Sequence, residues 1–154
     1  MATLYFNGAV DNEWTTLGNW WTDSGFTTQA TSLPTSADDV IATASISSNS
    51  GSAPTVVNFT LNDPSENFYF LGIAITVTGN ANFNEYSYND GTVNGDATFN
   101  DSSVNYGAIG GNATFNDSSF AHPLGLYYGT VTFQNRTLYP LKRGVNSSSL
   151  LAIV

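Results

Sequence analysis

The sequence contains no cysteine, so disulfides, thiol catalysis and cysteine metal sites are all excluded. Charged residues make up only 10% of the 154 residues, and His122 is the single histidine. No apolar run approaches the length of about 20 residues that a membrane-spanning helix needs. The chain has 41% hydrophobic and 14% aromatic residues, which is too many for a disordered chain. We therefore expect one ordered domain with no cross-links and no membrane partner.

Basic residues are scarce, and the net charge of −9 comes from twelve carboxylates against three cations. This balance argues against a nucleic-acid partner, because phosphate binding needs basic side chains. All twelve carboxylates lie at or before Asp117, and all three cations follow it. Two interpretations stay open: chance, with so few cations, or an acidic body and a basic tail that attract each other within or between copies.

The N-terminus, Met1–Phe6, has neither the basic residues nor the apolar stretch of a signal peptide. We therefore expect the protein to be made in a cytoplasm and not exported. Asn, Ser, Thr and Gly fill most of the polar positions, which suits stacked turns and an exposed β surface better than it suits helices.

A nine-residue phrase is the most prominent pattern in the chain, and its clearest copy contains Gly-Asn-Ala-Thr-Phe-Asn-Asp. It occurs three times at intervals of 16 residues, and a degraded fourth copy follows after 18. A short fixed period of this kind indicates a stacked repeat. The copies are residues 77–85, 93–101, 109–117 and 127–135.

Period-2 alternation within each copy predicts a strand. In the second copy, residues 93–100 alternate small or apolar residues with polar ones, so one face points to a narrow core. Residues 100–103 then form a turn, residues 104–106 a second short strand and Gly107 a corner, which gives two strands and two turns per repeat. The predicted repeat core consists of Phe83, Val93, Ala97, Phe99, Ile109, Ala113, Phe115 and Phe133.

This pattern is compatible with two all-β architectures. One is a short β-solenoid with about 16 residues per coil, and the other is an antiparallel β-meander or sandwich with a hairpin per repeat. Equivalent residues stack directly on one another in a solenoid but lie two strands apart in a meander. The solenoid therefore explains the repeated identities better, and we favour it.

Three regions follow from the position of the repeat: residues 1–54, the repeat region 55–135 and the tail 136–154. In the first region, residues 4–6 and 40–46 read as strands. Exposed tryptophans there could stack on sugar rings, but we favour a cap over the open end of the solenoid, where large aromatics bury the most area. The aromatic cluster comprises Trp14, Trp20 and Trp21.

The tail carries the three cations and ends in the apolar run Leu150–Val154. Apolar residues are unfavourable in water, and the last coil of a solenoid is an open β edge, so we expect the tail to pack on its own domain or on another subunit. The expected assembly interface comprises Trp14, Trp20, Trp21, Arg136, Lys142 and Arg143.

No catalytic or cofactor-binding constellation can be read from the sequence. His122 precedes a proline in a loop and is better explained as structural. Asp38 and Asp39 are adjacent, so on a strand they point to opposite faces and cannot flank one glycosidic bond. Asp101 and Asp117 stacked one repeat apart could bind Ca²⁺, but the glycine-rich pattern of calcium-binding solenoid repeats is missing, and we favour a solvated turn. We expect no enzyme activity, no metal and no cofactor.

The residues Trp14, Gly18–Trp21 and Leu33–Val40 lead into the repeats. Together with the repeats they resemble the start of structural proteins of tailed-phage virions and of β-helical bacterial surface proteins. In phage proteins of this kind, the resemblance implies a trimeric solenoid that serves as a capsid decoration (cement) protein or as a tail-fibre segment.

We therefore expect a non-enzymatic virion protein, a homotrimer that binds the major capsid protein or another virion protein and stabilises the shell. The alternative is a tail-fibre segment or surface adhesin that binds carbohydrate through the tryptophan cluster. A polysaccharide-degrading β-helix is disfavoured, because the repeat region has few coils and no groove of substrate length.

Overall fold

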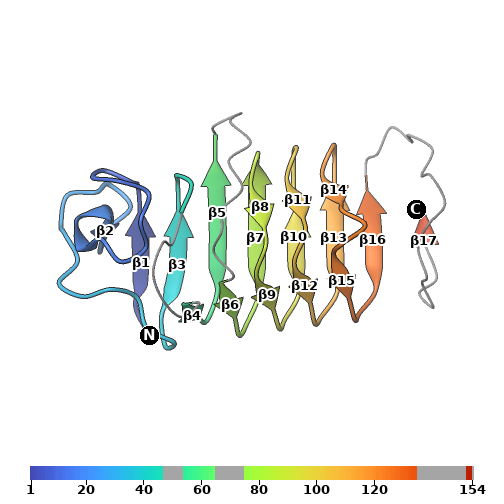
Figure 1. Ribbon diagram of the computed structural model, residues 1–154, viewed down its shortest axis with the longest axis horizontal. Coiled ribbons are helices and arrows are strands. Elements are labelled where there is room, and N and C mark those ends of the chain that lie inside the picture. The colour runs from blue at the N-terminus through green and yellow to red at the C-terminus, as the bar shows by residue number, and fades with distance from the viewer. Residues whose placement is uncertain (47–53, 65–74, 135–151, 154) are drawn as a thin grey trace.

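A computed structural model describes residues 1–46, 54–64, 75–134 and 152–153, and it confirms the β-solenoid (Figure 1). The coils stack along the long axis of the molecule, with the N-terminus near one end and the last described strand, residues 152–153, at the other (Figure 1). In the described repeats the strands of neighbouring coils pair in parallel. The antiparallel meander or sandwich is therefore wrong.

Within the described residues, the strands form three sheets that run along the axis. A nine-stranded sheet contains β2 (Trp20–Trp21), β1 (Thr3–Phe6), β3 (Asp39–Ala42), β5 (Phe59–Asp63), β7 (Ala81–Glu85), β10 (Ala97–Phe99), β13 (Ala113–Asn116), β16 (Val131–Gln134) and β17 (Ala152–Ile153). A five-stranded sheet contains β4 (Thr55–Val56), β6 (Thr76–Val77), β9 (Thr92–Val93), β12 (Ala108–Ile109) and β15 (Leu126–Tyr127). A three-stranded sheet contains β8 (Tyr88–Asn89), β11 (Val104–Asn105) and β14 (Phe120–Ala121).

Each regular coil contains three strands and not the two that the alternation predicts. The stretch 93–100 is divided between β9 and β10, which belong to different sheets, because the chain turns a corner between them. A Cβ on Gly95 would lie 2.5 Å from the carbonyl oxygen of Gly79 in the coil before, so this corner admits no side chain. The inward alternation continues through the corner, and period 2 alone cannot reveal the bend.

The nine-stranded sheet also crosses the boundary predicted between residues 54 and 55. β3 pairs in parallel with β5, and β1 pairs in parallel with β3, so both N-terminal strands extend the sheet of the repeats. The strand predicted at residues 4–6 is confirmed by β1, and that predicted at residues 40–46 is shorter and ends at Ala42. Of the tail, only β17 lies within the described residues, and its backbone pairs in parallel with β16.

Phenylalanine side chains stack through the core of the repeats. The ring centroids of Phe83 and Phe99 are 4.9 Å apart, and those of Phe99 and Phe115 are 4.7 Å apart, with the rings nearly parallel in both pairs. Phe133 continues the stack at 5.3 Å from Phe115 and is half-buried. The other seven predicted repeat-core residues are at most 2% exposed.

Asparagine amides form a second stack on the outer side of the same sheet. The Nδ2 group of Asn100 donates to the Oδ1 of Asn84 at 2.6 Å, and that of Asn116 donates to Asn100 at 2.7 Å. Asn84 in turn donates to Asn62 at 2.6 Å. Each of these amides therefore bonds to its neighbour, which explains why Asn follows Phe in the three regular copies.

A third ladder links the corners through side-chain oxygens. The Oδ1 of Asn80 accepts the backbone amide of Asp96 at 2.8 Å, and a carboxylate oxygen of Asp96 accepts that of Asn112 at 2.7 Å. Asn112 accepts the amide of Thr130 in the same way at 3.0 Å. At each of these corners, a backbone amide that has no partner in the sheet donates to a side-chain oxygen of the preceding coil.

In the last described coil, two inward positions change side-chain size in opposite directions. Asn105 pairs with Ala121, and Ile109 pairs with Tyr127, so one position shrinks where the other grows. A Cβ on Gly125 would lie 2.7 Å from the Tyr127 hydroxyl and 2.9 Å from the Asn105 amide nitrogen, which places the phenol beside Asn105. Asn105 is buried, and its Oδ1 accepts from the Asn89 amide at 2.7 Å. Burial raises the pKa of Tyr127 to about 12, so the phenol stays neutral at physiological pH.

Phe99→Ala tests the stacked core. The substitution should lower the free energy of unfolding by about 3–5 kcal/mol, because it opens a cavity between two rings that remain in place. Thr98→Ala changes an outward residue of the same strand and should cost less than about 1 kcal/mol. Urea denaturation followed by circular dichroism measures both values. A cost below about 1 kcal/mol for Phe99→Ala would contradict the assigned core.

Asp38 ties the beginning of β1 to the loop before β3. Its carboxylate accepts the Ala2 amide at 2.9 Å, the Thr35 amide at 3.0 Å and the Thr35 hydroxyl at 2.7 Å. The Thr35 hydroxyl, followed by the two backbone amides, lowers the pKa of Asp38 below its ordinary value of 3.8. Because the folded-state pKa is the lower one, the ionised carboxylate stabilises the fold above pH 3.8, and this contribution is lost as the pH falls through the folded-state pKa.

Asp38→Asn should therefore destabilise the protein more at about pH 7 than at about pH 3. Denaturant unfolding of both proteins at the two pH values measures the difference. Asp117→Asn removes one negative charge elsewhere and serves as the control for net charge. An equal loss of stability at both pH values would show that the Asp38 carboxylate contributes nothing through its ionised form.

Candidate functional site

Trp14 and Trp20 form the centre of an aromatic cluster inside the N-terminal part of the chain. Their ring centroids are 4.7 Å apart with the rings edge to face, and Trp20 makes a similar contact with Phe6 at 5.0 Å. The indole nitrogen of Trp20 donates to the carbonyl oxygen of Trp14 at 2.8 Å. Trp14 is 5% exposed and Trp20 is 0% exposed. Both side chains therefore belong to the core, which leaves little surface of either for the expected assembly interface.

Asn19 closes the loop that wraps this cluster. It ends the short 3-10 helix η1 (Leu17–Asn19), and its buried side chain accepts the Val10 amide at 2.9 Å and the Asp11 amide at 3.2 Å. Its own amide donates to the Asp11 carboxylate at 2.7 Å, and this bond contributes most to a lowered pKa of Asp11. These bonds pin the loop against its own chain.

Trp21 points the other way from Trp20, as adjacent residues on a strand do. It is half-buried, its indole nitrogen donates to the Oδ1 of Asn7 at 3.0 Å, and its ring lies 6.3 Å from that of Phe26. Of the three tryptophans, Trp21 alone keeps a surface that a partner or a sugar could reach. The other members of the expected interface, Arg136, Lys142 and Arg143, lie outside the described residues.

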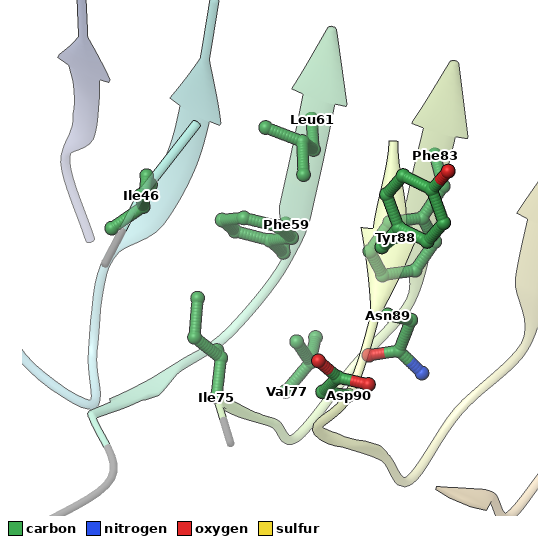
Figure 2. A pocket seen from close by; sticks show the side chains of 9 residues that line it. All are labelled: Ile46, Phe59, Leu61, Ile75, Val77, Phe83, Tyr88, Asn89 and Asp90. Carbon is green, nitrogen blue, oxygen red and sulfur yellow. The ribbon is translucent and has the colours of Figure 1, made fainter. Parts of the chain in front are cut away.

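A small internal cavity separates the irregular coils from the first regular repeat (Figure 2). Its volume of about 20 Å³ is enough for one water molecule and far too small for a substrate. Burial raises the pKa of Asp90, which lies at its polar side with Asn89 (Figure 2). The cavity is lined by Ile46, Phe59, Leu61, Ile75, Val77, Phe83, Tyr88, Asn89 and Asp90.

Acidic residues stack at one turn of successive coils, as the repeat predicts. Glu85, Asp101 and Asp117 each have a positive φ, between 53° and 59°, which an Asp tolerates better than most residues. The Asp101 carboxylate accepts the Glu85 backbone amide at 3.1 Å, so it already has a structural role. Across the described ranges, no group of three or more His, Asp or Glu side chains could hold a metal ion.

His122 lies on the outer surface, in a column of aromatic rings. Its ring centroid is 4.1 Å from that of Tyr106, which stacks on Tyr88 at 6.0 Å. The Nδ1 atom of His122 accepts the Leu124 amide at 3.2 Å. The three rings cover one another's faces, so this column offers little flat surface to a sugar.

None of the helices in the described part of the chain is long and apolar enough to cross a membrane.

The sequence prediction missed a set of exposed apolar residues on the last described coil. They are Phe120, Leu124, Leu126 and Tyr128, and we call them the apolar coil face. A comparison of outward positions between repeats would have found Leu126 and Tyr128, because earlier coils carry small or polar residues at the aligned positions.

The two adjacent tryptophans provide a matched test of the cluster. Trp20→Ala should lower the free energy of unfolding by about 3–5 kcal/mol, and Trp21→Ala by about half of that or less, because only Trp20 is fully enclosed. Thermal and urea unfolding of both variants measure this difference. Equal losses would contradict the opposite orientations of the two side chains.

Comparisons with protein-family models, with curated proteins and with solved structures found no match. The function is therefore inferred from the residues of this chain.

Proposed function

We propose that the protein is a non-enzymatic structural component of a virion, a homotrimeric decoration protein that binds the major capsid protein and stabilises the shell. The proposal rests on one observation: most side chains of the regular coils are engaged in holding the coils together. Inward residues fill the core, outward asparagines bond to one another, and corner residues bond to the next coil. Such a body suits a scaffold that presents surfaces.

Its charge supports a role in assembly. The described residues carry carboxylates in every coil up to Asp117, whereas the three basic side chains of the chain follow Gln134 in the sequence. Separated charges of this kind favour contacts between copies or with another virion protein. The apolar coil face adds a hydrophobic surface close to the same end of the chain.

The alternative, a tail-fibre segment or surface adhesin that binds carbohydrate through the tryptophan cluster, now depends on Trp21. Two of its three tryptophans are buried and cannot stack on a sugar. The aromatic column of Tyr88, Tyr106 and His122 does not replace them, because its rings stack on one another.

Particle composition tests the proposal. Particles purified on a density gradient from a lysate that contains the protein should retain it, in a constant ratio to the major capsid protein by quantitative mass spectrometry. A copy number comparable with that of the capsid protein is expected for decoration. Absence from intact particles would overturn the proposed function, and a ratio of only a few copies per particle would favour a tail location.

A further inference from the structure

The outward side of the last described coil departs from the repeat. Leu126 pairs with Ala108, which pairs with Thr92, so a large apolar residue occupies a position that is small or polar in earlier coils. Leu126 is 56% exposed. An outward position contributes nothing to core packing, so the fold does not require this leucine.

Tyr128 repeats the same departure two residues later. Its backbone amide donates to Ile109, as the amide of Gly110 donates to Val93 one coil earlier, so Tyr128 takes the place of Gly110. Tyr128 is 75% exposed. On the neighbouring sheet, Phe120 pairs with Val104 and is also exposed.

A two-residue insertion extends the same surface. Two residues separate Asn105 from Ala108, but four separate their partners Ala121 and Leu126. His122 stacks on Tyr106, and the Gly125 amide closes the turn onto His122 at 2.9 Å, so the extra residues are Pro123 and Leu124. Leu124 is 73% exposed at the corner between the two sheets.

The apolar coil face is also the least charged part of the acidic body. Residues 118–134 contain no charged side chain, whereas residues 81–117 contain five carboxylates, and we call these coils the acidic flank. The five are Glu85, Asp90, Asp96, Asp101 and Asp117. Two acidic copies repel each other least where they meet through neutral surfaces. The three Lys and Arg side chains follow this stretch in the sequence, beginning with Arg136, and can attract the acidic flank of a neighbour.

We propose that a second copy of this chain docks on the apolar coil face, which is the surface of self-association. The inference rests on the proposed function, because a decoration protein of this kind is a homo-oligomer. In a trimer, the apolar coil faces of three copies meet about the symmetry axis, which buries them together and leaves the acidic flanks outside. The inference names residues that the expected interface of tryptophans and cations did not contain.

The test uses the full chain and a variant that restores the repeat. Leu126→Thr with Tyr128→Asn introduces the residues Thr92 and Asn94 of an earlier coil, so the solenoid tolerates both. Leu124→Asp, in the insertion, is an independent variant. Val10→Ser is the matched control, because Val10 is 66% exposed in the N-terminal region, away from the apolar coil face. Sedimentation velocity and native mass spectrometry over a range of concentrations give the oligomeric state, and circular dichroism checks the fold.

Wild type and Val10→Ser should form the same oligomer, and both apolar-face variants should remain folded but associate about tenfold more weakly or worse. Unchanged association of the two folded variants would overturn the inference. A wild-type chain that stays monomeric at about 100 μM would also overturn it, and would indicate that the chain's own residues or another protein cover the face. Neither result depends on the particle experiment, so failure of the docking surface and failure of the virion role can be told apart.

Discussion

Parallel, in-register stacking of the coils is the constraint on which the rest of the structure depends. Strands in a sheet lie about 4.8 Å apart, so equivalent side chains of successive coils lie at the same spacing. That distance suits stacked rings, and the phenylalanine centroids are 4.7 and 4.9 Å apart. It also suits amide-to-amide hydrogen bonds, which join the asparagines at 2.6 and 2.7 Å. A residue that stacks well on itself is therefore repeated, and the identities in the sequence follow from this geometry.

This constraint explains which parts of the fold could be predicted. The period, the inward set around Phe99 and the turn at residues 100–103 are all visible as repeated letters, and the structure contains each of them. The third strand of each coil was missed, because a corner built on Gly95 bends the chain without interrupting the alternation. Glycine at such a corner is required by the close approach of two backbones, which a single copy of the repeat does not reveal.

The packing of the N-terminal region could not be predicted in this way, because this region contains no repeat whose copies can be compared. The sequence places Trp20 and Trp21 side by side, but which of them is enclosed depends on what packs against each side of β2. The loop pinned by Asn19 covers the side of Trp20, together with Phe6 and Trp14. Contacts between residues that are separate in the sequence decide which tryptophan is buried, so a local sequence pattern cannot predict it.

The last described coil lies between the regular repeats and the region without a repeat. It follows the repeat in its backbone but departs from it at two kinds of side-chain position. Inside, Ala121 and Tyr127 replace Asn105 and Ile109 as a compensating pair that keeps the core filled. Outside, Leu126 replaces Ala108 and stays 56% exposed, with no offsetting change at another position that the structure describes. A substitution that the core does not need, at a position exposed to water, is unfavourable for an isolated monomer and favourable only when the surface is covered. The interior of this coil is therefore explained by the fold, and its exterior by the proposed contact with a second copy.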